Sequence, residues 1–526
     1  MDDKTNPQAW TCKRFLLVAG LAIFWALENC VVQATAFPGA PSTLHPWTFS
    51  LIRFCLDASF AGFVVFAFNR AGLLVAATLS FLISLAVLPY GIYFHHALSL
   101  GAMHAAGEGL SVADLALKFV PWWMWLSLLA ALGLKVFWVF KITPQPRAHR
   151  FQLAGACVMA SVAIVVTLQV SSFHFGRLRV ERASRAVFVY GYLNTWIAEY
   201  FLAPPMKQVI AQAQALQNDS PDRLTIQDPV WPAVQNVAIV QLESVGWQAL
   251  HCRINGKEVM PYFSHLADSS RLYKVKSFHD LGSADMDYAV LSDGTPSSSI
   301  LSYEIPGLTY TNDLPRFMQH QGFHTVAFHG NGGSFFNRRE NYARMGFDEI
   351  LFREDLREAS LPLSRWGLRD ADLFAASSRK MSSGSGAHQF HFLITIDSHA
   401  PFDVVTDSEK EIFPHSTDWR ENYFNSLISL DHTIEKYVTS LPAGTLVVFY
   451  GDHTPGVEYG DFRSEREGNA EYVPCVMHYC GASKDWVTAG SEKNVPADLR
   501  ILDVMNAMRH EMTRDSLPHL ADISSR

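Results

Sequence analysis

The sequence has few cysteines and no arrangement of them that would hold a structural zinc ion. Seven cysteines are scattered through 526 residues, and without a C-x-x-C pair a zinc ribbon is not expected. Cys475 and Cys480 could pair in an oxidising compartment or stay as buried thiols. The formal net charge is −8 and there is no basic stripe, so nucleic acid is not an expected partner.

Long apolar runs are missing after residue 175, but before it about five segments have the roughly 20 residues that a membrane-spanning helix needs. They cover residues 15–36, 47–69, 71–93, 119–140 and 151–173. Lysine and arginine gather before the first segment and between the fourth and fifth. By the positive-inside rule the N-terminus is cytoplasmic. The sequence therefore predicts a multi-pass protein of the cytoplasmic membrane, with everything after residue 173 on the extracytoplasmic side.

One alternative for the first span stays open. Ala34-Thr35-Ala36 is similar to a signal-peptide cleavage site, and cleavage there would leave the large domain on the same side. Four charged residues also fall in or at the ends of the spans, which is costly in a bilayer: Glu28, Arg53, Asp57 and Lys135. Arg53 and Asp57 are four residues apart, so on a helix they could neutralise each other.

The remainder of the chain divides by composition into a connection and a second domain. After the predicted spans of residues 1–173, residues 174–230 contain four arginines, a cluster of aromatic residues and then Pro204-Pro205. A basic and aromatic segment beside a membrane is typical of interfacial helices, with a solvated linker helix as the alternative. From residue 231 to 526 short apolar runs alternate with helical stretches, which indicates an α/β domain with a central, mostly parallel sheet and helices on both faces.

Several apolar runs of this second domain end in a chemically active side chain. Residues 236–241 lead to Glu243, residues 325–328 to His329, residues 391–396 to Asp397-Ser398-His399, and residues 446–450 to Asp452-His453. In open α/β sheets, ligands bind beyond the carboxyl ends of the strands. Carboxylate and imidazole groups together suit a divalent metal ion, although a turn aspartate and a capping histidine would explain Asp452 and His453 equally well when taken alone.

A nucleophile is the remaining requirement, and Ser283 is the candidate. It follows Gly282 and precedes A-D-M-D-Y-A-V-L, which reads as a helix with acidic residues in its first turn. A hydroxyl at this position is an ordinary N-cap. The same position also stabilises an alkoxide or a bound phosphate, because the helix dipole and free N–H groups favour negative charge.

Taken together, these segments resemble the alkaline phosphatase/sulfatase superfamily, and within it the lipoteichoic acid synthase type of membrane phosphoglycerol transferase. The matching segments, in the family's order, are Q-L-E-S at 241–244, G-S-A-D-M-D-Y at 282–288, F-H-G-N-G-G-S-F-F-N-R at 328–338, W-G-L-R-D at 366–370, D-S-H-A-P-F at 397–402 and Y-G-D-H at 450–453. The resemblance implies a bacterial inner-membrane protein whose extracytoplasmic domain, residues 231–526, has a sulfatase-like fold. No Cys-x-Pro-x-Arg or Ser-x-Pro-x-Arg segment is present, so sulfate ester hydrolysis is not expected.

The resemblance also implies roles for individual residues. One divalent metal ion, Mn²⁺ by expectation with Mg²⁺ or Zn²⁺ as alternatives, would be bound by Glu243, Ser283, Asp452 and His453. The phosphoglycerol pocket would be lined by His329, Phe336, Arg338 and His399, of which Arg338 and His399 would act in catalysis with Ser283. The family usually has threonine as the nucleophile, so Ser283 is a departure, and Ser277, Ser292 and Thr295 are the alternative hydroxyls.

The predicted activity is a metal-dependent transfer of phosphoglycerol. Ser283, activated by the metal, would attack phosphatidylglycerol in the lipid bilayer and release diacylglycerol. An acceptor hydroxyl on a cell-envelope glycan or polymer would then displace the phosphoglycerol from Ser283. Two alternatives remain: a phosphoethanolamine transferase of the same superfamily, and a catalytically degenerate membrane sensor that binds lipid headgroups without turnover.

Overall fold

The computed structural model describes most of the 526-residue chain. The described residues are 19–32, 46–94, 98, 120–141, 147–169, 187, 190–202, 206–218, 234–297, 300–357, 364–383, 388–463, 466–467, 470–481 and 499–515. The chain forms two compact units, Met1–Ala203 and Pro204–Arg526. We call them the membrane unit and the outer unit and describe each by itself.

The membrane unit is helical. Its described helices are Ala19–Val32, α2 (Pro46–Ala67), α3 (Arg70–Phe94), α7 (Trp122–Lys141), α8 (Arg147–Gln169) and α11 (Tyr192–Leu202). Three stretches, Arg70–Ile92, Trp122–Lys141 and Phe151–Leu168, are long and apolar enough to cross a membrane. The predicted count of about five spans is therefore confirmed only for these three. The first predicted span is described over just Ala19–Val32, and α2 contains the charged residues Arg53 and Asp57.

Buried ion pairs neutralise the charges within these helices. Arg53 Nε lies 2.8 Å from Asp57 Oδ2 within α2, as the four-residue spacing predicts, and Arg53 Nη1 donates to the carbonyl of Val187 at 2.9 Å. Lys135 Nζ on α7 lies 2.8 Å from the carboxylate of Glu28 on the first helix. An unpaired charge inside a bilayer is costly, and pairing removes most of that cost. The Lys135–Glu28 pair also joins α7 to the first helix, and Arg53 joins α2 to Val187.

Much of the predicted connection, residues 174–230, lies outside the described residues, including its four arginines. The described aromatic residues Tyr190, Tyr192 and Trp196 are buried in the membrane unit. Trp196 Nε1 donates to the carbonyl of Leu98 at 2.8 Å. These three rings therefore pack the membrane unit. The second described helix of the connection, α12 (Met206–Asn218), belongs to the outer unit.

The outer unit is built on a central sheet. Its described strands are β1 (Asn236–Leu242), β2 (Arg253–Ile254), β3 (Lys257–Glu258), β4 (Arg271–Lys276), β5 (Phe323–His329), β6 (Glu349–Leu351), β7 (His388–Ile394), β8 (Thr445–Gly451), β9 (Arg466–Glu467) and β10 (Ala470–Tyr479). The order is β4-β10-β8-β1-β7-β5-β6, with β9 paired to β10 and β2-β3 as a separate hairpin. Strands β8, β1, β7, β5 and β6 pair in parallel, whereas β10 runs antiparallel to β8, β4 and β9. The sheet is therefore mixed.

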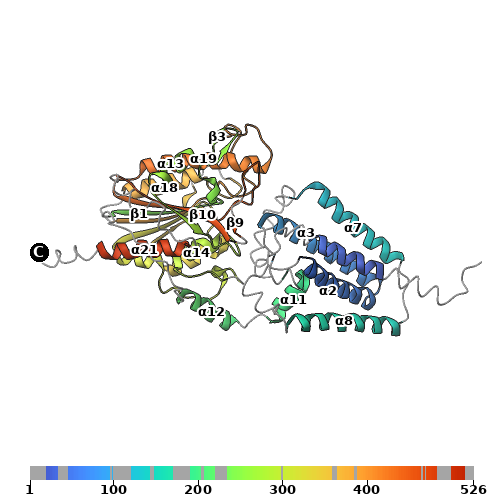
Figure 1. Cartoon of the computed structure of the whole chain (residues 1–526). Helices are drawn as coiled ribbons and strands as arrows, with labels where there is room; N and C mark the ends of the chain where they lie inside the picture. The colour runs from blue at the N-terminus through green and yellow to red at the C-terminus, as the bar shows by residue number, and fades with distance from the viewer. Residues whose placement is uncertain are drawn as a thin grey trace, which may run out of the picture. The chain divides into compact units, whose positions relative to one another are not determined.

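Helices cover both faces of this sheet. The described α-helices of the outer unit after α12 are α13 (Pro261–Asp268), α14 (Ala284–Ser292), α15 (Leu314–His320), α16 (Arg338–Met345), α17 (Arg353–Leu356), α18 (Asp370–Ser383), α19 (Trp419–Ser440) and α21 (Ile501–Asp515). Figure 1 shows α13, α18 and α19 over one face and α14 and α21 over the other. Because both faces are covered, β1 and β8 are buried along almost their whole length. Each buried Val, Ile or Phe contributes roughly 1.5–3 kcal/mol.

Helix α19 illustrates how sequence and packing agree. Asp418 caps its first turn by accepting a hydrogen bond from the backbone N–H of Arg420, which satisfies a donor that the helix itself leaves open. Apolar side chains at three- and four-residue spacing along α19 are buried, as Tyr423, Leu427, Leu430, Ile434 and Tyr437 show. This helix therefore packs against the sheet, and its stripe binds no cofactor.

The core histidine of β7 gives a test of the fold. His391 is fully buried, and burial lowers its pKa to about 3. The unfolded chain therefore binds a proton on this residue at a pH where the folded chain does not, and stability falls as the pH drops below about 6.5. We expect His391→Gln to reduce the pH dependence of the unfolding free energy by about 1.4 kcal/mol per pH unit between about pH 4 and 6.

Guanidinium titrations of the detergent-solubilised chain at several pH values measure this slope. His415→Gln is the matched control, because the His415 side chain is 81% exposed. A pH dependence that is equal in both variants would contradict the buried, neutral state of His391.

Candidate active site

Three side chains meet where β1 and β8 end. In the parallel pairing of these strands Leu242 lies opposite Gly451, so the next residues, Glu243 and Asp452, emerge side by side. The amide of Asp452 donates to the carbonyl of Leu242 at 3.2 Å, which continues the pairing past the strands. His453 follows directly, and its Nε2 lies 3.1 Å from Glu243 Oε1 and 3.7 Å from Asp452 Oδ2.

The backbone at this point tolerates few substitutions. A Cβ on Gly451 would lie 1.9 Å from the carbonyl oxygen of Val245, so only glycine lets the chain after β1 cross the end of β8. Ser244 adopts a φ of 57°, a conformation that costs a serine free energy. Its N–H donates to Asp452 Oδ1 at 2.8 Å and its hydroxyl donates to Glu243 Oε1 at 2.9 Å. The strained residue thus fixes both carboxylates.

The chemistry of this group fits a divalent cation. Glu243, Asp452 and His453 each offer a ligand atom within 4.8 Å of the others, and all three are buried. The Nδ1 of His453 donates to the carbonyl of Thr454 at 2.8 Å, so Nε2 is the nitrogen that faces the carboxylates. Asp452 Oδ2 is buried and has no hydrogen-bond partner among the described residues. A buried, unpartnered carboxylate oxygen is costly, and a metal ion would satisfy it.

Electrostatics inside the group are strongly coupled. Burial opposes ionisation of Glu243, but the charge of His399 and the contact with His453 lower the pKa of this carboxyl below its usual range. Burial and the nearby charge of Glu243 raise the pKa of Asp452. Burial would lower the pKa of His453, but the two carboxylates raise it to about 10. In the metal-free chain a proton on His453 therefore occupies the position where a cation would bind.

A second group of candidate ligands shares His453 and includes His279 and Glu471. The rings of His279 and His453 are stacked, with centroids 4.1 Å apart and planes 8° apart. Because the lone pairs lie in the ring planes, two parallel rings do not point at one ion. Glu471 lies 3.6 Å from His279 Nδ1 and accepts a hydrogen bond from the N–H of Thr454 at 2.9 Å. His279 and Glu471 therefore hold His453 in its orientation.

Ser283 stands at the N-terminus of α14, and its hydroxyl makes no capping hydrogen bond. The first turn is instead held by Asp285, which accepts from the N–H groups of Asp280 and Leu281 at 3.0 and 2.7 Å. Gln241 on β1 donates to the carbonyl of Ser283 at 3.4 Å, so Ser283 lies beside the strand that carries Glu243. The Ser283 hydroxyl therefore does not cap α14, so N-capping does not account for a serine at this position.

The three alternative hydroxyls differ in position. The Ser277 hydroxyl lies close to the candidate ligands, but it donates to the carbonyl of Asp452. Ser292 lies at the opposite end of α14. Thr295 lies beyond the end of that helix.

His329 ends β5 next to β7, opposite Ile394. Its Nδ1 donates to the carbonyl of Ile394 at 3.1 Å, and its Nε2 is buried with no hydrogen-bond partner among the described residues. Burial and the charge of Arg338 lower the pKa of His329 to about 3. The ring is therefore neutral, and its Nε2 is an acceptor.

His399 is positioned by the W-G-L-R-D segment. The ring centroids of Trp366 and His399 lie 4.1 Å apart, and Trp366 Nε1 donates to the carbonyl of Ala400 at 3.1 Å. Asp370 accepts hydrogen bonds from the N–H groups of Ile396 and Asp397 at 2.7 and 3.0 Å. The Nδ1 of His399 donates to the carbonyl of Ala400 at 2.9 Å, which leaves Nε2 to exchange protons.

Arg338 pairs with a carboxylate on the first turn of α14. Its Nε and Nη2 bond the two oxygens of Asp287 at 3.1 and 3.0 Å, and the hydroxyls of Tyr303 and Tyr342 donate to the same carboxylate. The guanidinium also lies 5.1 Å from the centre of the Phe336 ring. The two-pronged contact expected for a phosphate is therefore made with Asp287.

Phe336 itself has a φ of 52° and lies against Gly282, where an added Cβ would be 3.3 Å from its ring. It is thus next to Ser283. Sequence reasoning missed Asp287, His279 and Glu471, because a carboxylate inside a helix and an isolated histidine give no signal of their own. Cys475 in β10 and Cys480, which follows that strand, are both free thiols.

Comparison with known proteins agrees with this geometry. The profile of the Sulfatase family matches residues 235–500. Lipoteichoic acid synthase 2 of Bacillus subtilis is 27% identical over 324 residues, 56% of this chain and 47% of the relative. The lipoteichoic acid synthase-like protein YvgJ of the same organism is 24% identical over 249 residues, 45% of this chain and 39% of the relative. The chain thus spans less than half of these relatives.

A solved structure shares the fold over nearly the whole chain. The lipooligosaccharide phosphoethanolamine transferase A of Neisseria meningitidis, an integral membrane protein, matches with a TM-score of 0.59 and 14% identity, over 94% of this chain and 95% of that one. The resemblance to lipoteichoic acid synthases predicted from the sequence is confirmed. Through the outer unit, the chain belongs to the Sulfatase family.

Proposed function

We propose that this protein transfers phosphoglycerol from phosphatidylglycerol to an acceptor hydroxyl of a cell-envelope glycan or polymer. The observation that carries the proposal is the buried group Glu243, Asp452 and His453. Beside it, Ser283 stands at the N-terminus of α14 with a hydroxyl that makes no capping hydrogen bond. Relatives named lipoteichoic acid synthases support the class of reaction. A divalent ion held there, Mn²⁺ by expectation, would supply a Lewis acid that stabilises the Ser283 alkoxide.

In the first step Ser283 Oγ forms a bond to phosphorus, and the bond from phosphorus to the diacylglycerol oxygen breaks. The leaving oxygen needs a proton, and His399 Nε2 delivers it because Nδ1 is held by Ala400. In the second step the acceptor hydroxyl attacks the same phosphorus, gives its proton to His399, and the bond to Ser283 breaks. Ser283 enters the first step and leaves the second as the same alkoxide. His399 gives up one proton in the first step and regains one in the second, so bonds and protons balance.

The headgroup end of the substrate is recognised by His329. Its neutral ring presents an unprotonated Nε2, which accepts a hydrogen bond from a glycerol hydroxyl. Phe336 forms the adjacent apolar wall. Arg338 fixes this wall and, through Asp287, the helix that carries Ser283. In this arrangement Arg338 contributes by holding the site together, and its remaining N–H groups contribute positive charge.

The membrane unit keeps the outer unit at the surface that contains the lipid donor, which raises the effective donor concentration. We place the outer unit on the extracytoplasmic side of the bacterial inner membrane, because lysine and arginine gather on the opposite loops. The acceptor is then a component of the cell envelope.

Phosphoethanolamine transfer is the second candidate. The same His329 Nε2 would accept a hydrogen bond from an ammonium group, and the solved phosphoethanolamine transferase of Neisseria meningitidis has a similar fold. The two activities differ in the lipid consumed, so assays with phosphatidylglycerol and with phosphatidylethanolamine distinguish them.

The nucleophile can be tested by substitution. We expect Ser283→Ala to reduce release of diacylglycerol from labelled phosphatidylglycerol by at least about 1,000-fold, since the attacking oxygen is lost. Ser283→Thr is the matched control and should keep measurable turnover, because it retains the hydroxyl. Thin-layer chromatography of the lipid products quantifies both, and undiminished turnover by Ser283→Ala would refute the assignment.

Metal binding gives an independent test. We expect Asp452→Asn to weaken Mn²⁺ binding by more than about 100-fold, beyond the loss typical of residues that only orient ligands. Asp431→Asn is the control, since this buried carboxylate accepts hydrogen bonds from the N–H groups of Tyr262 and Phe263 at the start of α13. Calorimetric titration of metal-stripped protein measures the affinity, and equal affinities in the two variants would exclude Asp452 as a ligand.

A further inference from the structure

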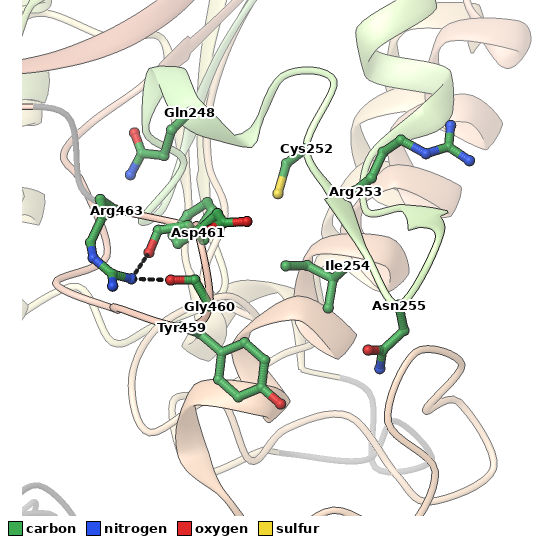
Figure 2. Close-up of a pocket in the computed structure, with 10 residues that line it drawn as sticks. Gln248, Cys252, Arg253, Ile254, Asn255, Tyr459, Gly460, Asp461 and Arg463 are labelled. Carbon is green, nitrogen blue, oxygen red and sulfur yellow. Dashed lines mark hydrogen bonds between the residues drawn. The ribbon is translucent and has the colours of Figure 1, made fainter.

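A cavity of about 600 Å³ lies in the outer unit, and its lining includes neither the candidate metal ligands nor Ser283. One wall is formed by residues 248–255, which include β2, and the other by residues 459–463 of the loop after β8 (Figure 2). The β2-β3 hairpin turns through Asn255 and Gly256, both at positive φ, which is the favoured two-residue turn of a hairpin. The volume lies in the range of about 300–1,000 Å³ that small-molecule sites have.

A chain of contacts links the cavity to the candidate active site. Residues 248–255 follow β1 and Glu243, and residues 459–463 follow Asp452 and His453. The ring of Phe462 in the cavity lies 5.8 Å from the ring of Tyr423. The hydroxyl of Tyr423 in turn donates to the carbonyl of Ser244 at 3.0 Å. One tyrosine therefore separates the cavity from the residue that fixes both carboxylates.

The charged side chains around the cavity are held by hydrogen bonds to their own loops. Arg463 Nη1 donates to the carbonyls of Gly460 and Phe462 at 2.6 and 2.9 Å (Figure 2). Arg253 Nη2 donates to the carbonyl of Gly256 at 2.6 Å, and Figure 2 shows its side chain directed away from the other lining residues. Both guanidinium groups thus brace their own loops, while Asp461 adds a negative charge to the lining.

The polar groups that remain are neutral. Both amide atoms of Gln248 are buried without a hydrogen-bond partner among the described residues, a state that costs free energy. Asn255 adds a second amide, and the buried side chains of Ile254 and Phe462 add apolar surface. Amides that can donate and accept, beside apolar faces, match the hydroxyls and C–H faces of a sugar ring.

We propose that this cavity is an acceptor subsite, which holds a neutral hexose unit of the glycan while another unit of the same chain reacts at Ser283. The inference rests on the proposed transfer to an envelope acceptor and narrows that acceptor to a glycan of uncharged hexoses. A glycerol phosphate polymer is the competing occupant, which would bind through Arg253 and Arg463 instead of the amides, and the labelling experiment below separates the two.

Cys252 provides a direct reporter of occupancy, because it lines the cavity and is a free thiol. The full chain in detergent is labelled with methyl methanethiosulfonate at about pH 9, since burial raises the pKa of Cys252 to about 11. Mass spectrometry of the peptide containing Cys252 gives the labelling rate. We expect neutral hexose oligosaccharides such as maltoheptaose to slow it several-fold and glycerol 3-phosphate to leave it unchanged. If glycerol 3-phosphate slows the labelling of Cys252, or if neither compound slows it, the proposal is overturned.

Kinetics separate this proposal from the proposed function. For transfer to the oligosaccharide that protects Cys252, we expect Gln248→Ala and Asn255→Ala to raise KM about tenfold each, the effect of a typical lost hydrogen bond, with little change in kcat. Gln208→Ala, on the exposed side of α12, is the matched control. An unchanged KM in both cavity variants would refute the subsite. Absence of diacylglycerol release by the unmodified protein would instead refute the transfer reaction itself.

Discussion

The structure of the active site depends on the parallel pairing of β1 with β8. This pairing sets Leu242 opposite Gly451, and the register brings Glu243 and Asp452 out at the same level. A shift by one residue would turn one of the two carboxylates to the opposite face of the sheet. The close crossing at Gly451 and the strained backbone of Ser244 complete the arrangement. Two chain segments about 200 residues apart are thereby held to the precision that a metal site requires.

Burial gives this arrangement its chemistry and also its cost. Two carboxylates and an imidazole inside a protein are unfavourable unless a counter-charge compensates them. In the metal-free chain a proton on His453, whose pKa is raised to about 10, partly supplies that charge. The same principle operates at Asp287, where Arg338 and two tyrosine hydroxyls surround one carboxylate. Asp452 Oδ2, by contrast, is a buried carboxylate oxygen of the ligand group that has no hydrogen-bond partner among the described residues.

Much of the fold could be predicted because its signals are local. Short apolar runs at 236–241, 325–328, 391–396 and 446–450 predicted the strands β1, β5, β7 and β8, and the helical stretches between them predicted an α/β domain. The antiparallel β10 could not be predicted, because strand direction depends on the path of the chain and not on composition. Among the described residues of the membrane unit, three helices are long and apolar enough to cross a membrane. The pairing of Arg53 with Asp57 lowers the cost of two charges within α2.

For the site, sequence reasoning identified the residues at strand ends but not the residues that orient them. Glu243, Asp452 and His453 were found because the ends of parallel strands converge. Arg338 was expected to bind phosphate, and its contact with Asp287 could not be foreseen because the two residues are far apart in sequence. His279 likewise acquires meaning only from its stacking on His453. Contacts between distant segments decide such roles, and no local pattern encodes them.

If one cation binds between the ends of β1 and β8 within reach of Ser283, anomalous X-ray diffraction from crystals soaked in Mn²⁺ will locate it. We expect a peak bounded by Glu243, Asp452, His453 and the Ser283 hydroxyl, at metal–ligand distances of roughly 2.0–2.2 Å. A peak between His279 and Glu471, or one from which the Ser283 hydroxyl is remote, would contradict this expectation.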